Sequence, residues 1–191
     1  MDNKAAELDE LYGAYGKLIS LQPVADGKRM ICGAGPLDAP LVVVGEAPGR
    51  EEDLRGEPFV GPSGKLLQHL FARAGLPWEF CYRMNVLPWR PPGNRTPDNF
   101  EIVDSYNRVE REIAIISPLI VVAAGAVAWQ AVTRGQGGRF SAAVGNWAES
   151  GFPYRLLPIW HPAFILRSAG YERDRFELDM VQALHFALAE Q

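Results

Sequence analysis

The chain has 191 residues, 48% of them hydrophobic and 22% charged, with a formal net charge of −4; this predicts one globular domain over residues 1–191 and disfavours indiscriminate binding to nucleic-acid phosphates. No apolar run is long enough to span a bilayer and the N-terminus is too acidic for a signal peptide, so we expect a cytoplasmic monomer without a membrane partner. The two cysteines, Cys32 and Cys81, provide no disulfide framework and fit a reducing compartment as structural thiols.

Apolar residues recur with a helical period from Ala5 to Leu21, and Pro23 ends this predicted helix. Apolar runs further along predict buried strands at Leu41–Val44, Met84–Leu87, Leu119–Ala124 and Leu156–Trp160. Helices are predicted at Lys65–Ala74, Asn99–Ile116, Gly125–Val132 and Glu172–Glu190. This alternation predicts an α/β fold, a three-layer α/β/α sandwich around a central, mainly parallel four-stranded sheet.

The segment 41–70 is predicted to be strand, loop and helix, and its GEAPG loop follows the strand at the point where α/β sheets bind ligands. Gly61 and Gly64 open the helix, and small residues there let a flat ring or a polyanion approach the backbone N–H groups. Glu46, Asn85 and His161 all sit at the carboxyl ends of predicted strands, and Asn85 belongs to the strand Met84–Leu87 itself. We therefore expect these side chains to meet in one cleft.

Three ordered blocks in the chain read GEAPGREEDLRGEPFVGPSGKLL, NVLPWRPPGNR and HPAFILR. Together they resemble the uracil-DNA glycosylase superfamily, closest to its family 4, the iron–sulfur branch, over Gly33 to Arg167. The resemblance implies a monofunctional uracil-DNA glycosylase that flips uracil out of DNA and hydrolyses its N-glycosidic bond. Its expected partners are single- or double-stranded DNA containing uracil, with free uracil as the product.

The resemblance also assigns roles. His161 is expected to donate to uracil O2, and Glu46 to orient water and stabilise the cationic sugar, with Asp53 as the alternative carboxylate. Better-known relatives place an aspartate at the position of Ala47. The expected uracil-binding residues are Gly45, Ala47, Glu52, Phe59, Asn85 and His161.

Within this set, Phe59 stacks on the flipped ring and Asn85 reads its edge. The amide of Asn85 accepts from uracil N3–H and donates to O4, a pattern that cytosine inverts. By resemblance, Glu52 is expected to form the wall that excludes the thymine methyl group. Residues expected to contact DNA are Arg90, Arg95, Pro162, Phe164 and Arg167, with Phe164 or Ile165 as a wedge and an apolar core role as the alternative for Phe164.

The family's cluster-binding cysteines correspond to Leu18, Leu21 and Trp89, and the fourth belongs in the helix Asn99–Ile116, which contains no cysteine. We therefore expect no metal and no cofactor, with apolar packing of Leu18, Leu21 and Trp89 in place of the cluster.

Other interpretations stay open at this point. The chain could act on another deaminated base such as hypoxanthine or xanthine, or be a catalytically inactive nucleic-acid-binding homologue. A nucleotide-binding module with GEAPG as a phosphate loop is a further alternative, which the absence of a GK[ST] ending disfavours. Apart from the resemblance, Glu46 reads as a loop-capping acid, His161 as a core histidine and Phe59 as a core aromatic.

Overall fold

A computed structural model of the protein describes residues 3–20, 29–148, 151 and 153–189. Its central sheet has four strands in the order β2-β1-β3-β4, and every neighbouring pair is parallel. The strands are β1 (Leu41–Gly45), β2 (Cys81–Asn85), β3 (Ile120–Ala124) and β4 (Arg155–Ile159).

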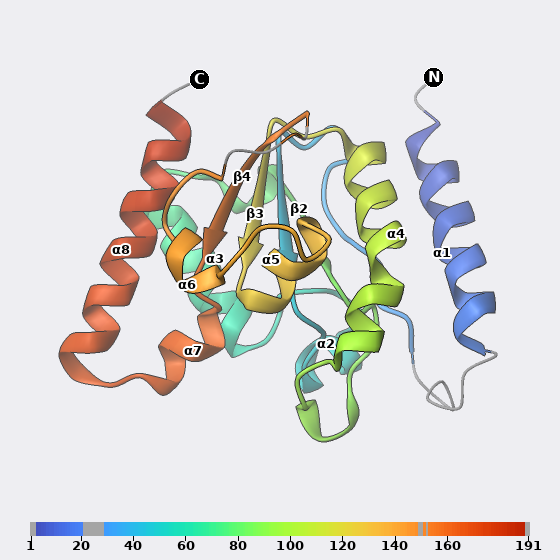
Figure 1. Cartoon of the computed structure of the whole chain (residues 1–191), viewed down its shortest axis with the longest axis horizontal. Helices are drawn as coiled ribbons and strands as arrows, with labels where there is room; N and C mark the ends of the chain where they lie inside the picture. The colour runs from blue at the N-terminus through green and yellow to red at the C-terminus, as the bar shows by residue number, and fades with distance from the viewer. Residues whose placement is uncertain (1–2, 21–28, 149–150, 152, 190–191) are drawn as a thin grey trace.

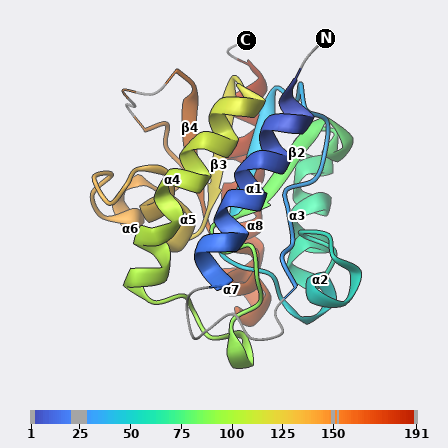
Figure 2. The same cartoon turned by 90° about the vertical axis from the view of Figure 1, so that its right-hand side faces the viewer.

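Helices cover both faces of this sheet. They are α1 (Lys4–Ser20), α2 (Arg50–Arg55), α3 (Pro62–Arg73), α4 (Asn99–Ile116), α5 (Ala126–Val132), α6 (Phe140–Ala143), α7 (Pro162–Arg167) and α8 (Gly170–Ala189), with 3₁₀ turns η1 (Trp78–Phe80) and η2 (Pro92–Asn94). Figure 1 shows α1 and α4 on one side of the sheet and α3 and α8 on the other, and Figure 2 shows α1 alongside α4. The expected three-layer α/β/α fold is confirmed.

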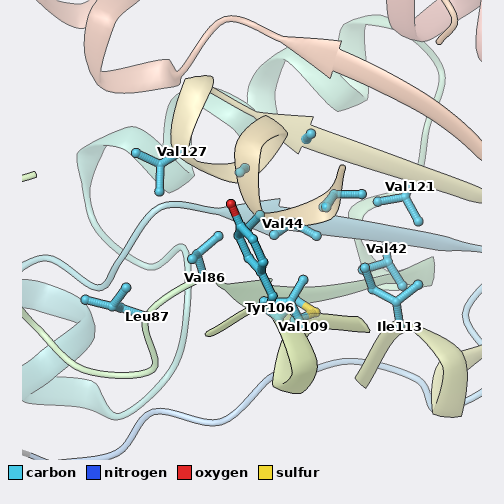
Figure 3. Packing of buried hydrophobic residues seen from close by; sticks show 14 of the residues in the cluster. Val42, Val44, Val86, Leu87, Tyr106, Val109, Ile113, Val121 and Val127 are labelled. Carbon is cyan, nitrogen blue, oxygen red and sulfur yellow. The ribbon is translucent and has the colours of Figure 1, made fainter. Parts of the chain in front are cut away.

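The strands are apolar on both faces because both faces are covered. Val42 and Val44 of β1 pack in the cluster formed with α1, α4 and α5, while Leu41 and Val43 pack in the cluster formed with α3, α7 and α8. Figure 3 shows the first cluster, in which valines of the sheet meet Ile113 and other side chains of α4. The two clusters fix the sheet between the helix layers, so the strand ends are held in a set position.

Some boundaries differ from the sequence prediction. β2 begins at Cys81 and ends at Asn85, so it lies earlier than the predicted strand at Met84–Leu87. The short helices α2 and α7 were not predicted, and α7 replaces the loop expected at HPAFILR. Pro162 occupies the first turn of α7, where its missing N–H costs nothing.

No helix in the described ranges has the length and apolar content needed to cross a membrane.

Candidate active site

A cavity of about 550 Å³ opens at the carboxyl ends of the strands. Residues following β1, β2 and β4 line it together with the starts of α2 and α3. Of the residues predicted from the sequence, it brings together Glu46, Ala47, Glu52, Phe59, Asn85, Arg95, His161 and Arg167. The size suits a single base or nucleoside-sized ligand.

The floor of the cavity depends on Gly45, the last residue of β1. Gly45 is in register with Asn85 of the neighbouring strand. A Cβ at position 45 would collide with Asn85 Oδ1 and approach Phe59 Cζ to 2.7 Å. The glycine therefore lets an aromatic ring and an amide lie side by side at the bottom of the cavity.

Phe59 is held in a backbone conformation that few non-glycine residues adopt, with φ of 60°. Its ring is buried and meets Trp78 edge-on, with 6.0 Å between ring centroids. Gln68 Nε2 donates to the Phe59 carbonyl over 3.3 Å, and a Cβ on Gly64 would collide with that carbonyl. The close approach of α3 thus fixes a left-handed residue whose ring faces the cavity, a feature typical of functional sites.

Glu52 holds two glycine-rich turns together. Its carboxylate accepts from the backbone N–H of Gly49 over 3.1 Å and of Gly61 over 2.7 Å, the N-cap residues of α2 and α3. The backbone N–H groups of Gly49 and Gly61, at the starts of α2 and α3, therefore already donate to a carboxylate of the protein itself. This disfavours GEAPG as a phosphate loop, because a bound phosphate would meet negative charge.

His161 lies two residues beyond β4 and is the N-cap of α7. The backbone N–H of Ala163 donates to His161 Nδ1 over 3.1 Å, so Nδ1 carries the lone pair and the proton of the neutral ring is on Nε2. Burial, with a smaller contribution from the Arg167 guanidinium, lowers the pKa of His161 to about 4. The imidazole is thus an uncharged N–H donor at neutral pH.

Glu46 directly follows β1 and lines the same cavity, half-buried. Burial raises the pKa of its carboxyl group, and the nearby Arg167 guanidinium partly offsets this shift. No hydrogen bond reaches the Glu46 carboxylate from any residue that the structure describes. The carboxylate is therefore available to a ligand or a water molecule.

Other predicted residues lie around or outside the cavity. Asp53 is outside the lining, with its Oδ2 3.9 Å from Arg90 Nη1, so the cavity brings Glu46 and not Asp53 together with His161. Arg90 Nε also donates to Asn94 Oδ1 over 2.7 Å, and Arg95 pairs with Glu101 through two hydrogen bonds of 2.7 and 2.8 Å. Both arginines are therefore already paired within the protein, and only Arg95 lines the cavity.

The DNA-contact residues predicted near His161 divide by exposure. Pro162 is buried within the start of α7, which speaks against direct DNA contact. Phe164 is 39% exposed and stacks on Trp160 with ring centroids 5.2 Å apart, so it combines a packed face with an open one. Arg167, at the end of α7, is exposed and lines the cavity.

The sequence prediction missed several lining residues, namely Arg50, Ser63, Asn94 and Thr96. Arg50 opens α2, a helix of six residues that has Gly49 before it, acids in its first turn and Gly56 after it in the left-handed conformation. Those glycines and acids are a helix start and stop signal that predicts α2. Asn94 and Thr96 belong to the RPPGNR loop, whose stiffness was recognised but whose side chains were not assigned.

The residues present do not fit an iron–sulfur cluster. Trp89 is buried and stacked on Tyr15, with 6.0 Å between ring centroids, and its indole N–H has no hydrogen-bond partner among the residues described. No group of three or more His, Cys, Asp and Glu side chains in the described part of the chain could hold a metal ion. The Leu18 side chain and Leu21 lie outside the described residues, so their packing stays a prediction.

The fold and this cavity define an α/β protein with a polar ligand site at the carboxyl ends of parallel strands. A model of the uracil DNA glycosylase superfamily matches residues 32–185. The chain belongs to this superfamily, which confirms the resemblance drawn from its motifs.

Relatives named as type-4 uracil-DNA glycosylases cover most of the chain. The relative from Thermotoga maritima is 36% identical over 154 residues, which cover 81% of this chain and 80% of the relative. The relative from Archaeoglobus fulgidus is 39% identical over 77% of this chain and 76% of its own length. The relative from Pyrobaculum aerophilum is 31% identical over 80% of this chain and 81% of its own length.

Proposed function

We propose that the chain is a monofunctional uracil-DNA glycosylase, a hydrolase of DNA repair that removes uracil from single- or double-stranded DNA and leaves an abasic site. The superfamily match and the type-4 relatives support the activity. The observation that carries the residue roles is the convergence of Glu46, Asn85 and His161 on one cavity. The proposal includes a cytoplasmic monomer of one domain that works without an iron–sulfur cluster.

Recognition begins with a base turned out of the stack, because the glycosidic bond of a paired base is out of reach. The ring of Phe59 offers a flat face at the cavity floor. The Asn85 amide lies next to this ring, and both side chains are close to Gly45. The amide carbonyl accepts from uracil N3–H and its NH₂ donates to O4. Cytosine presents the reverse pattern and leaves both amide groups unpaired, which rejects it.

Bond cleavage places negative charge on uracil and positive charge on the sugar. The C1′–N1 bond breaks with its electron pair leaving on uracil, and the oxygen of a water molecule adds to C1′. The proton that this water loses ends, through solvent, on the uracil anion, so the products are an abasic sugar and neutral uracil. A neutral His161 donates from Nε2 to uracil O2 as charge develops there, without first needing a proton from solvent. Such a donor stabilises the transition state more than the bound substrate.

The Glu46 carboxylate supplies negative charge next to the sugar, which becomes positively charged in the transition state. Because the protein leaves it without a hydrogen-bond donor among the described residues, it can orient the attacking water and stabilise the cationic sugar. Its raised pKa marks a carboxylate that loses hydration on folding, as expected for a group reserved for a ligand.

Thymine exclusion is assigned to the wall around Glu52. Its carboxylate ties Gly49 to Gly61, so the wall is held by two backbone hydrogen bonds. A rigid wall next to C5 of the base leaves no room for a methyl group. Arg167 at the mouth of the cavity holds a phosphate, and the exposed face of Phe164 lies next to it on α7 as the wedge.

The direct test uses oligonucleotides carrying one uracil, single-stranded or paired with guanine or adenine, followed by alkali cleavage of any abasic site. Matched strands with thymine, cytosine, hypoxanthine or xanthine test the base preference. Excision of uracil that disappears with His161→Ala supports the proposal. Preferential excision of a purine, or binding without excision, refutes it.

A further inference from the structure

A buried ion pair lies on the α4 side of the sheet, away from the cavity. Arg108 and Glu112 are one turn apart on α4, and their side chains are 1% and 0% exposed. Arg108 Nη1 donates to Glu112 Oε2. A buried pair of this kind gives little net stability by itself, so the groups that it holds indicate its role.

Glu112 joins the segments around it. Its carboxylate accepts from the Tyr12 hydroxyl over 2.7 and 2.8 Å and from the Tyr82 hydroxyl over 2.9 Å. Burial, and next the Glu112 carboxylate, raise the pKa of both tyrosines well above the ordinary value, so both hydroxyls stay protonated and donate. Tyr12 in turn accepts from the Gly33 N–H over 2.9 Å. Helices α1 and α4, β2 and the segment before β1 thus share one network.

Arg108 directs its other terminal nitrogen at the end of β2. Nη2 donates over 2.6 Å to the carbonyl of Asn85 and over 2.6 Å to that of Val86. β2 is an edge strand, with β1 on one side only. Arg83 exchanges backbone hydrogen bonds with Ala34 on the outer side, and the Asn85 carbonyl, two residues on, faces that same side. Arg108 thus takes the place that a further strand would have.

We propose that Arg108, fixed by Glu112, is a positioning residue for uracil recognition: it holds the carboxyl end of β2 so that the Asn85 amide meets the base edge. The inference rests on the proposed role of Asn85. The backbone of Asn85 is held from one side by β1, in register with Gly45, and from the other by Arg108. Without the guanidinium, a buried carbonyl next to the cavity loses its partner and the strand end loosens.

The network connects the same segments that, by resemblance, carry the cluster ligands in the iron–sulfur branch. By resemblance, the cluster ligands belong to the end of α1, the segment after β2, and α4, the same segments that Arg108 and Glu112 connect. The Arg108 guanidinium lies 5.7 Å from the Tyr12 ring centroid and 5.5 Å from that of Tyr15, and Tyr15 carries the stacked Trp89. Hydrogen bonds and ring contacts here tie together what thiolates and iron tie together in that branch.

The test removes the pair without leaving a buried charge. In Arg108→Met with Glu112→Leu, both charges go and the volume stays similar, so folding should persist. We expect single-turnover excision of uracil at saturating enzyme to fall about 10- to 100-fold, as for a misplaced recognition group. In the Asn85→Ala background the same double change should alter excision by less than about twofold, because its effect passes through Asn85.

Two comparisons keep the outcome decisive. The exposed pair between Glu110 of α4 and Arg134, which follows α5, is removed by Arg134→Met with Glu110→Leu and should leave excision unchanged. Arg108→Lys keeps the positive charge beside Glu112 but lacks the forked guanidinium that reaches both carbonyls. Its rate of uracil excision should therefore lie between those of wild type and the double variant. If the double variant does not fold, Arg108→Lys alone provides the test. Equal losses with and without the Asn85 amide would overturn positioning. Wild type without any uracil excision would refute the proposed function, and the inference with it.

Discussion

Two carboxylates of this protein, the buried Glu112 on the α4 side of the sheet and the half-buried Glu46 at the carboxyl ends of the strands, have opposite surroundings. Glu112 accepts from two tyrosine hydroxyls and a guanidinium, whereas Glu46 has no hydrogen-bond donor among the residues described. Burial raises the pKa of both carboxyl groups. Burial alone therefore does not distinguish a structural acid from a catalytic one.

The difference lies in what the protein leaves unpaired. Around Arg108, the chain pairs the charges with each other, with hydroxyls and with backbone carbonyls. In the cavity, His161 uses one ring nitrogen on the backbone and keeps the other for a ligand. Both terminal nitrogens of Arg108 and both oxygens of Glu112 are paired, and only Arg108 Nε lacks a partner among the residues described. A network paired to this extent makes a rigid support, whereas unpaired groups that face a cavity make a reactive site. Each prediction below alters one side of this comparison.

The largest effect is expected on stability, from Glu112→Leu. This change leaves the Arg108 guanidinium buried without its anion, and breaking such a pair costs about 3–5 kcal/mol in the free energy of unfolding. Urea denaturation followed by circular dichroism measures it. The control is Glu110→Leu, whose exposed pair with Arg134 is worth less than about 1 kcal/mol. Similar losses in the two variants would contradict the structural role of Glu112.

On the cavity side, His161→Ala should leave the fold intact and reduce single-turnover excision by about 100- to 1000-fold, the contribution of one oxyanion donor. Binding of a uracil oligonucleotide should change little, because the donor acts on charge that develops in the transition state. His69→Ala, on the exposed face of α3, is the matched control. An excision rate near that of wild type would return His161 to an ordinary core histidine.

Asn85→Asp tests the polarity of base reading. The change removes the donor to uracil O4 and adds an acceptor for the amino group of cytosine, an exchange worth about 1–3 kcal/mol of discrimination. We expect most uracil excision to be lost and cytosine excision to become detectable on matched oligonucleotides. Asn85→Ala should keep only a residual, measurable uracil excision and gain none toward cytosine. If both variants keep full uracil activity, Asn85 does not read the base.

The pH dependence of kcat/KM separates the two catalytic groups. Glu46 acts as the anion, and its pKa is raised, so activity should fall with decreasing pH earlier than an ordinary glutamate of pKa about 4.3 would cause. His161 acts as the neutral N–H donor, and its pKa of about 4 keeps most of it uncharged above that pH. Between about pH 4.5 and 8, kcat/KM should therefore fall on the acid side with a single titration, and Glu46→Gln should remove that fall. A limb that persists in Glu46→Gln would assign the titration to another group.

The smallest effect is expected from chelation. With Trp89 stacked on Tyr15 where the resemblance places a cysteine, the purified protein should be colourless and keep full activity after exhaustive treatment with a chelator. Iron analysis and the visible spectrum check this. Iron close to cluster stoichiometry, lost together with activity, would contradict it.

The sequence alone determined the layers and most of the cavity. The apolar strand at β1, the glycines after it and the position of His161 after β4 are local patterns with local causes, and they placed Glu46, Asn85 and His161 at one edge of the sheet. The short helices α2 and α7 were missed because six residues are too few for a periodic pattern, and such helices depend on caps and packing.

Only the tertiary structure decided which polar residues are structural. Arg108 and Glu112 have the spacing of an exposed ion pair on a helix, and the sequence carries no sign of their burial. They are buried because α1 packs on α4 and brings Tyr12 against them from a position 100 residues away in the chain. Likewise Glu52 lies in an acidic run, and only the approach of Gly61 to α2 gives its carboxylate a second backbone partner besides the Gly49 N–H of its own helix start. Contacts between distant segments set these roles, because burial and hydrogen-bond satisfaction are properties of the packed chain.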